Sequence, residues 1–168
     1  MEIFPNLPTI LYHVVFSTKG QAPLITAEIE GLLYSYLDGL VRSHDGLIIE
    51  SGGMPDHIHL LANFSPEKSL DEMIEAIKSG SADWLNENVD LAVPFAWQES
   101  WAAFSVSQTS APELMDYLRN QAEIHRHKTF KEELVELLEE NGIDDYDENE
   151  LWAPPRTFSP TSRSSPSL

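Results

Sequence analysis

Two histidines in an apolar segment have the types and spacing of a metal-binding pair. His57 and His59 alternate with Ile58 at the start of HIHLLANF (57–64), which is typical of a strand. Side chains two residues apart on a strand project from the same face, so both imidazoles should point one way while Ile58 enters the core. Neutral imidazoles are common ligands of divalent ions. An isolated His-x-His pattern is more often two surface or hydrogen-bonded histidines.

A tyrosine and a glutamine have a complementary spacing further along the chain. Tyr117 and Gln121 are four residues apart in a helical segment and should be neighbours on one helix face. A phenol with a pKa of about 10 is a poor nucleophile at neutral pH. A metal ion beside it would stabilise the charge that develops on a phosphate under attack. Taken alone, a tyrosine on an amphipathic helix is usually core, and a glutamine is usually solvated.

Tyr117 is the best candidate nucleophile among the five tyrosines. It alone has a potential metal ligand one helical turn away and cationic side chains close by in the sequence. The nearby cations, Arg119, Arg126 and Lys128, could contact phosphate, although a solvated helix face is about as consistent with the pattern. His125 and His127 are two residues apart on a helix, so their side chains should diverge and not share a metal.

The elements that must position these residues follow from apolar periodicity and turn signals. Strands are expected over 10–18, 47–51, 57–64 and 95–107, the last with a bend at Glu99-Ser100, and turn chemistry over 52–56 separates the second from the third. Helices are expected after Thr26, after a Ser69/Glu72 capping box, and after Ser110, where one long helix carries Tyr117 and Gln121. A further helix is expected over 131–140, ended by Asn141-Gly142.

This order predicts an α+β fold with a ferredoxin-like, split βαβ antiparallel sheet and an appended helix that carries the tyrosine. Residues 1–152 are expected to form a single domain, and the Pro/Ser-rich tail 153–168 is expected to be disordered. His13 is expected to be a core or sheet-face histidine. Asp56 is expected to be a turn residue, with orientation of a histidine as the minority interpretation.

The amino-acid composition limits the classes of protein to which the chain can belong. The chain has no cysteine, which excludes disulfides, thiolate metal sites and cysteine nucleophiles. Neither a signal peptide at Met1 to Asn6 nor a bilayer-length apolar run is visible, so we expect a cytoplasmic protein with no membrane partner. Ten Lys and Arg against 28 Asp and Glu give a net charge of −18, which by itself argues against nucleic acid. Ten of the acidic residues lie between Glu132 and Glu150, however, and a binding face is local.

Several long segments together resemble one family. These segments are YHVVFSTK (12–19), GGMPDHIHLLANF (52–64), FAWQESWAAFSVS (95–107), YLRNQAEIHRHKTF (117–130) and LW (151–152). In this order they resemble the single-tyrosine HUH transposases of the insertion-sequence 200/605 type, including the relatives associated with repetitive extragenic palindromes. The resemblance runs over about residues 8 to 152, nearly the whole predicted domain.

The resemblance implies a role for each matching residue. His57, His59 and Gln121 match the ligands of Mg²⁺ or Mn²⁺, and Tyr117 matches the nucleophile. Lys19, Arg119, Arg126 and Lys128 become candidate DNA contacts. The family acts on single-stranded DNA with hairpin ends, forms a 5′-phosphotyrosine link and leaves a 3′-OH that later rejoins strands. Its members are homodimers in which active sites are shared between subunits.

Two other functions compete with this one. A domesticated relative would hold DNA as a regulator without cutting it, and the intact Tyr117 argues against that. A metal-dependent phosphoesterase with paired histidine motifs would need two such motifs in one pocket, and the sequence has one. The sequence leaves open the DNA recognised, the mobility of the element, the physiological metal and the reason for the acidity.

Overall fold

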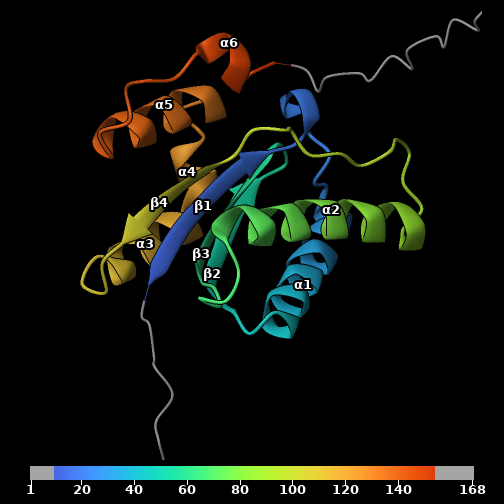
Figure 1. Ribbon diagram of the computed structural model, residues 1–168. Helices are drawn as coiled ribbons and strands as arrows, with labels where there is room; N and C mark the ends of the chain where they lie inside the picture. Colours follow the sequence, from blue (N-terminus) through green and yellow to red (C-terminus); the bar gives the residue numbers. More distant parts are fainter. Residues whose placement is uncertain (1–9, 154–168) are drawn as a thin grey trace, which may run out of the picture.

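One antiparallel sheet organises the molecule. Figure 1 shows the computed structural model, which describes residues 10–153. The sheet has the strand order β2-β3-β1-β4, and every pair of neighbours is antiparallel. Its strands are β1 (Leu11–Ser17), β2 (Leu47–Met54), β3 (His57–Asn63) and β4 (Ala102–Val106). The tail expected to be disordered, 153–168, lies outside the described residues except for Ala153.

Two long helices cover one face of the sheet. They are α1 (Ala27–Ser43) and α2 (Leu70–Asn88), and each connects two strands separated by a third, which gives two interleaved βαβ units (Figure 1). The predicted ferredoxin-like α+β fold is therefore confirmed. The predicted capping box is present, because Ser69 accepts from the Glu72 amide and Glu72 accepts from the Ser69 amide. The main core fills this side, with Ile58 among its fully buried members.

The remaining helices pack on the opposite face and beyond its edge (Figure 1). They are α3 (Ala111–Arg119), α4 (Gln121–Ile124), α5 (Phe130–Glu140) and the short α6 (Glu148–Leu151), while a 3₁₀ turn, η1 (Lys19–Gln21), follows β1. Two smaller apolar clusters hold α3 and α5 against this face. The α5 helix confirms the prediction for 131–140: it begins with a Thr129/Glu132 capping box, and Gly142 follows it at a φ of 70°.

The predicted turn over 52–56 is wrong in part. The β2 strand continues through Gly52 and Gly53 to Met54, so only Pro55 and Asp56 reverse the chain. The glycines serve packing instead of the turn. A Cβ on Gly52 would lie 2.1 Å from the carbonyl oxygen of Leu118, so the missing side chain lets α3 approach the sheet closely.

The single long helix predicted after Ser110 is also wrong. It is broken at Asn120, whose φ of −97° and ψ of 17° separate α3 from α4. The Asn120 side chain donates to the Asp116 carbonyl at 2.8 Å, and asparagine bonds of this kind favour helix ends. Ser110 makes no capping bond; the hydroxyl of Ser107 accepts from its amide at 3.2 Å.

The strand region predicted over 95–107 is shorter than expected. Only β4 is a strand, and Trp97 adds a single bridge to Thr18. Between Trp97 and β4 the Gln98 amide donates to the Ser17 carbonyl at 2.9 Å, and the Glu99 carbonyl accepts from Lys78 Nζ at 2.6 Å. Within residues 10–153, no helix has the length and apolar content needed to cross a bilayer.

Candidate active site and metal centre

The two histidines of β3 lie on the face covered by α3 and α5. His57 and His59 are both fully buried and alternate with Ile58, which packs into the core on the other face. The predicted common direction of the two imidazoles is therefore observed. The phenyl ring of Phe130, the first residue of α5, stacks on the His57 ring with centroids 4.3 Å apart.

Tyr117 and Gln121 meet these histidines in the same chain. The Gln121 amide oxygen lies 3.0 Å from His57 Nε2, and the Tyr117 ring lies edge-on to the His59 ring, with centroids 6.0 Å apart. The break at Asn120 leaves both side chains directed at the β3 histidines. The structure thus brings together all four residues that the sequence singled out for chemistry.

A carboxylate that the sequence analysis missed joins the four. Glu133 of α5 is buried, and its Oε1 lies 2.7 Å from His59 Nε2 and 3.3 Å from His57 Nε2. Its Oε2 accepts from the Tyr117 hydroxyl at 2.6 Å and from the Gln121 amide nitrogen at 3.1 Å. The signal was in the sequence, because Glu133 lies on the apolar face of its helix between Phe130 and Leu134.

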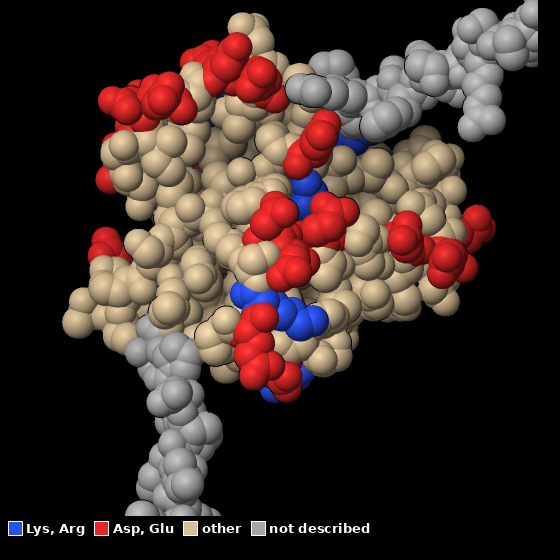
Figure 2. Space-filling view, in the orientation of Figure 1, with Lys and Arg blue, Asp and Glu red and all other residues tan. Residues whose placement is uncertain are grey.

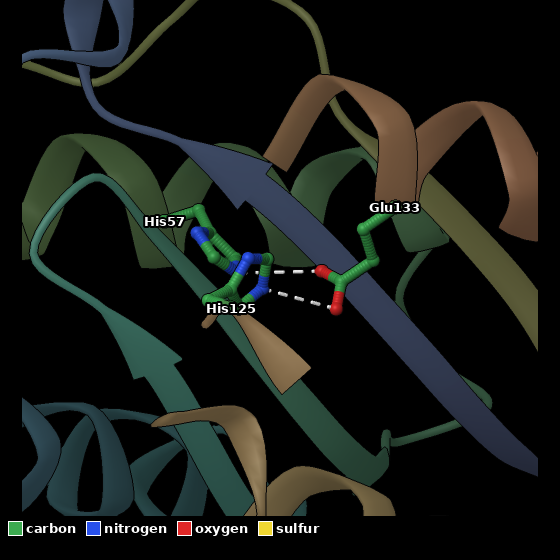
Figure 3. A group of neighbouring side chains, drawn as sticks. All are labelled: His57, His125 and Glu133. Atoms are coloured by element: carbon green, nitrogen blue, oxygen red, sulfur yellow. Dashed lines mark ion pairs between the residues drawn. The ribbon is translucent and has the colours of Figure 1, made fainter. Parts of the chain in front are cut away.

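His125 completes what we call the His–Glu cluster: His57, His59, Gln121, His125 and Glu133. Figure 3 shows His57, His125 and Glu133 pointing toward one another from β3, from the end of α4 and from α5. His125 Nε2 lies 3.1 Å from Glu133 Oε2 and 3.1 Å from the Gln121 amide oxygen. His127 is exposed, so the expected divergence of the two histidines is observed.

Each imidazole of the cluster has a partner at its other nitrogen. His57 Nδ1 lies 2.6 Å from the Asp56 carboxylate, His59 Nδ1 lies 2.8 Å from His13 Nε2, and His125 Nδ1 lies 2.8 Å from the Lys128 carbonyl oxygen. Such bonds fix the orientation of each ring, with Nε2 facing the cluster. Asp56 thus fits the minority interpretation, and His13 is buried as expected.

Burial and charge strongly perturb these groups. Burial lowers the pKa of His57, but its bonds to Asp56 and Glu133 outweigh this and raise the pKa to about 9. Burial would raise the pKa of Glu133, but its bonds to His57 and His59 hold the pKa well below its usual range. Burial and the neighbouring Glu133 both raise the pKa of Tyr117. The phenol is thus harder to ionise than a free tyrosine, and a cation beside it would offset this.

The donor set fits a divalent ion. The cluster offers imidazole nitrogens, an amide oxygen and a carboxylate. The distances from the Nε2 atoms of His57 and His59 to the Oε1 atoms of Gln121 and Glu133 are 2.7 to 3.3 Å. Ligands of an octahedral Mg²⁺ lie about 2.1 Å from the ion, and therefore about 3 Å from their neighbours. His57, His125 and Glu133 each present one ligand atom within 4.8 Å of the others.

A groove of about 320 Å³ reaches Tyr117 from the side of β4. It runs between α3 and α5, and its wall includes His13, Phe104, Ser107 and Leu114. Glu113 and Glu140 also line it. The groove makes Tyr117 accessible, whereas His57 and His59 lie buried beneath.

Three of the four candidate DNA-contacting cations are paired with carboxylates. Arg119 lies 2.8 Å from Glu50, Arg126 lies 2.9 Å from Glu123, and Lys128 pairs with Glu136. Lys19 is exposed on η1. In the view of Figure 2, acidic side chains gather over α5 and α6. Neighbouring carboxylates therefore offset the charges of Arg119, Arg126 and Lys128 in this structure.

Comparison with known proteins places this chain in a family. The chain is an α+β protein whose antiparallel sheet carries two buried histidines beneath an accessible tyrosine. Residues 6–121 match the family described as IS200-like transposases, and since this is more than half of the chain, the chain belongs to that family. The match ends at Gln121, so α5 and Glu133 lie beyond it.

Curated relatives and solved structures agree. The chain is 23% identical over 119 residues to the ISDra2 transposase TnpA of Deinococcus radiodurans, covering 66% of this chain and 82% of that protein. It is 27% identical over 116 residues to the insertion sequence IS200 transposase of Salmonella typhimurium, covering 67% and 76%. A putative transposase from D. radiodurans superposes with a TM-score of 0.55 at 20% identity, over 72% of this chain and 98% of that one. A REP-associated tyrosine transposase bound to a REP hairpin superposes with a TM-score of 0.53 at 10% identity, over 71% of this chain and 72% of that one.

Proposed function

We propose that this transposase cleaves and rejoins single-stranded DNA through a covalent bond between Tyr117 and a 5′-phosphate. His57, His59 and Gln121 hold the Mg²⁺ or Mn²⁺ that the reaction uses. One observation carries the proposal: the Tyr117 hydroxyl and the His59 imidazole bond to the two oxygens of the same carboxylate. Tyr117 therefore contacts the His–Glu cluster directly, through Glu133. On this function the chain would work in the cytoplasm, on cellular DNA.

In the proposed step the Tyr117 oxygen attacks a phosphodiester phosphorus. The new P–O bond forms as the bond to the 3′-oxygen breaks, and the proton lost by the phenol is balanced by the one that the 3′-oxygen gains. The bound ion supplies positive charge for the phosphate under attack. The released 3′-OH can attack a second phosphotyrosine in the reverse sense, so rejoining needs no external energy source. The hairpin in the REP-associated relative supports hairpin-ended DNA as the substrate.

The test is covalent capture on single-stranded DNA from the flanks of the protein's own gene. With Mn²⁺ present, the wild type should give a protein–DNA adduct on a denaturing gel. Tyr117→Phe removes one oxygen and keeps the ring volume, so it should lose the adduct but keep its fold and Mn²⁺ binding. His57→Ala should lose both adduct and calorimetric Mn²⁺ binding. Tyr36→Phe, on the opposite face of the sheet, is the matched control and should behave as wild type.

Two results would reject this mechanism. An adduct that persists in Tyr117→Phe would place the nucleophile elsewhere. Mn²⁺ binding in His57→Ala equal to that of the wild type would reject the metal assignment.

We also propose that the protein works as a homodimer, as the family resemblance implies. Within one chain Tyr117 already lies beside His57 and His59, which supports sites built inside each subunit rather than shared. Mixing His57→Ala with Tyr117→Phe subunits should then restore no adduct, even in proven heterodimers. Recovery of activity would instead show sites shared between subunits, and a clean monomer by light scattering at micromolar concentration would reject the dimer.

A further inference from the structure

Glu133 is a buried carboxylate whose ion-pair partners are histidines, side chains that also bind metals. It is buried at the centre of the His–Glu cluster, where its side-chain partners include His57, His59, Gln121, His125 and Tyr117. No Lys or Arg within the described residues is paired with it. A buried carboxylate surrounded by metal-ligating side chain types is an arrangement that a cation would satisfy.

We propose that Glu133 of α5 is a further protein ligand of the divalent ion, beside His57, His59 and Gln121. Oε1 is the ligand atom, since it lies within 3.3 Å of both β3 Nε2 atoms. Oε2 keeps the Tyr117 hydroxyl, 2.6 Å away, beside the ion. The inference rests on the proposed function and adds α5, which lies beyond the matched family region, to the active site.

Ligand chemistry supports a carboxylate at this point. Mg²⁺ and Mn²⁺ prefer oxygen ligands, whereas a site of imidazoles and one amide oxygen suits nickel or zinc as well. A charged oxygen donor therefore shifts the site toward the hard ions. It also offsets part of the charge of a divalent ion buried among neutral ligands.

The geometry also ties the nucleophile to the ion through a short, rigid connection. Glu133 lies in the first turn of α5, which the Thr129/Glu132 capping box and the buried Phe130 hold in place. A shift of α5 would therefore move the Tyr117 hydroxyl relative to the histidines. We infer that α5 sets the distance between the nucleophile and the ion.

A competing explanation makes the opposite prediction. In it the Glu133 carboxylate only balances the histidines in the metal-free protein and must leave when the ion binds. Removing it would then leave the Mn²⁺ affinity unchanged or raise it. If Glu133 is a ligand, removing it should lower that affinity. The sign of the change therefore separates the two.

The experiment is Mn²⁺ and Ni²⁺ calorimetry on the full chain without DNA. Glu133→Gln should bind Mn²⁺ at least about tenfold more weakly than wild type, since even partners outside the coordination shell have effects of that size. Its Ni²⁺ affinity should fall less, so the Mn²⁺/Ni²⁺ ratio drops, which a purely structural role would not produce. Glu139→Gln, the same charge change on the exposed side of α5, should leave both affinities unchanged.

Equal or tighter Mn²⁺ binding in Glu133→Gln would overturn the proposal. If this variant does not fold, Glu133→Asp retains the charge but retracts the carboxylate by one methylene. A ligand role predicts weaker Mn²⁺ binding in that variant too, and unchanged or tighter binding overturns it. Failure of the proposed function would give a different result from failure of this ligand proposal. In that case the wild type itself would bind no Mn²⁺ through His57 or would form no adduct through Tyr117.

Discussion

At the scale of single residues, the chemistry depends on which nitrogen of each imidazole holds a proton. Asp56 and His13 bond to the Nδ1 atoms of His57 and His59, so the Nε2 atoms face the cluster. In the metal-free protein, however, His59 Nε2 lies 2.7 Å from a carboxylate, a contact that needs a proton on that nitrogen. On the proposed function, a bound ion would therefore replace protons.

The raised pKa of His57 predicts how the stability of the metal-free protein varies with pH. Its pKa is about 9 in the folded chain against 6.5 for an ordinary histidine. The stabilisation by the charged ring is thus complete below pH 6.5 and is lost as the pH rises through about 9. We expect the free energy of unfolding to fall over this interval by at most about 1.4 kcal/mol per pH unit. Urea denaturation in the presence of a chelator measures it.

The stability below pH 6.5 and the behaviour of an Asp56 variant extend this prediction. Burial lowers the pKa of His13 to about 3 and also lowers that of His59, so stability should fall again as the pH drops below 6.5. Asp56→Asn removes a charge that favours protonated His57, so its alkaline loss should be smaller. An alkaline profile identical to that of the wild type would show that Asp56 does not hold the proton on His57.

The sequence predicted part of this residue-scale picture. The i, i+2 spacing of His57 and His59 and the joint match of segments identified four residues that lie together in the structure. His125 and Glu133 were missed because only the fold brings them to the β3 histidines; His59 and Glu133, for example, are 74 residues apart in the chain. Only the fold, which packs α5 over β3, shows that a glutamate on an apolar helix face meets imidazoles.

At the scale of elements, the sheet and the α1/α2 face were predictable because their apolar periodicity is regular. The errors arose where tertiary contacts overrule local signals. Gly52-Gly53 has the composition of a turn, yet it extends β2, because the backbone of α3 needs the space that a side chain would fill. Asn120 breaks the predicted helix between Tyr117 and Gln121, and the apolar pattern gives no sign of that break.

The close approach of α3 to β2 predicts the effect of Gly52→Ala. The new Cβ would lie 2.1 Å from the Leu118 carbonyl oxygen, so α3 must shift, and Tyr117 with it. We expect a loss of about 1–3 kcal/mol in stability and a larger fall in adduct formation than in Mn²⁺ affinity. Gly31→Ala, at an exposed helical position with nothing within 4 Å of the new Cβ, should instead stabilise the protein by about 0.5–1 kcal/mol. Wild-type adduct formation by Gly52→Ala would contradict the role assigned to this contact.

At the scale of the whole molecule, the two faces of the sheet have different tasks. One side buries the main core under α1 and α2, whereas the other carries buried polar groups under α3 and α5. The polar side is stable because its groups bond to one another: within the described residues, no buried side-chain nitrogen or oxygen lacks a hydrogen-bond partner. The charge is also unevenly placed along the chain: ten acidic residues lie between Glu132 and Glu150, and acidic side chains gather over α5 and α6 in Figure 2.

This charge predicts an unusual salt dependence of DNA binding. A protein that binds DNA with many free cations loses roughly 10³ to 10⁵ in affinity between about 50 and 200 mM salt. Here the net charge is −18, and Arg119, Arg126 and Lys128 are paired with carboxylates. Added salt screens the long-range repulsion of DNA over about 10 Å at 0.1 M. We therefore expect the affinity of Tyr117→Phe for single-stranded DNA with Mn²⁺ to change little, or to rise, over this range.

Fluorescence anisotropy with a labelled strand measures that affinity without cleavage, and a charge variant tests its cause. Glu136→Gln frees Lys128 from its partner, so at low salt it should bind DNA more tightly and with a steeper salt dependence than its parent. Asp90→Asn, a similar change beyond the end of α2 and far along the chain from the site, should alter neither. A steep loss of affinity with salt in the parent would mean that the three paired cations leave their carboxylates to contact phosphate, and that the acidic surface does not oppose binding.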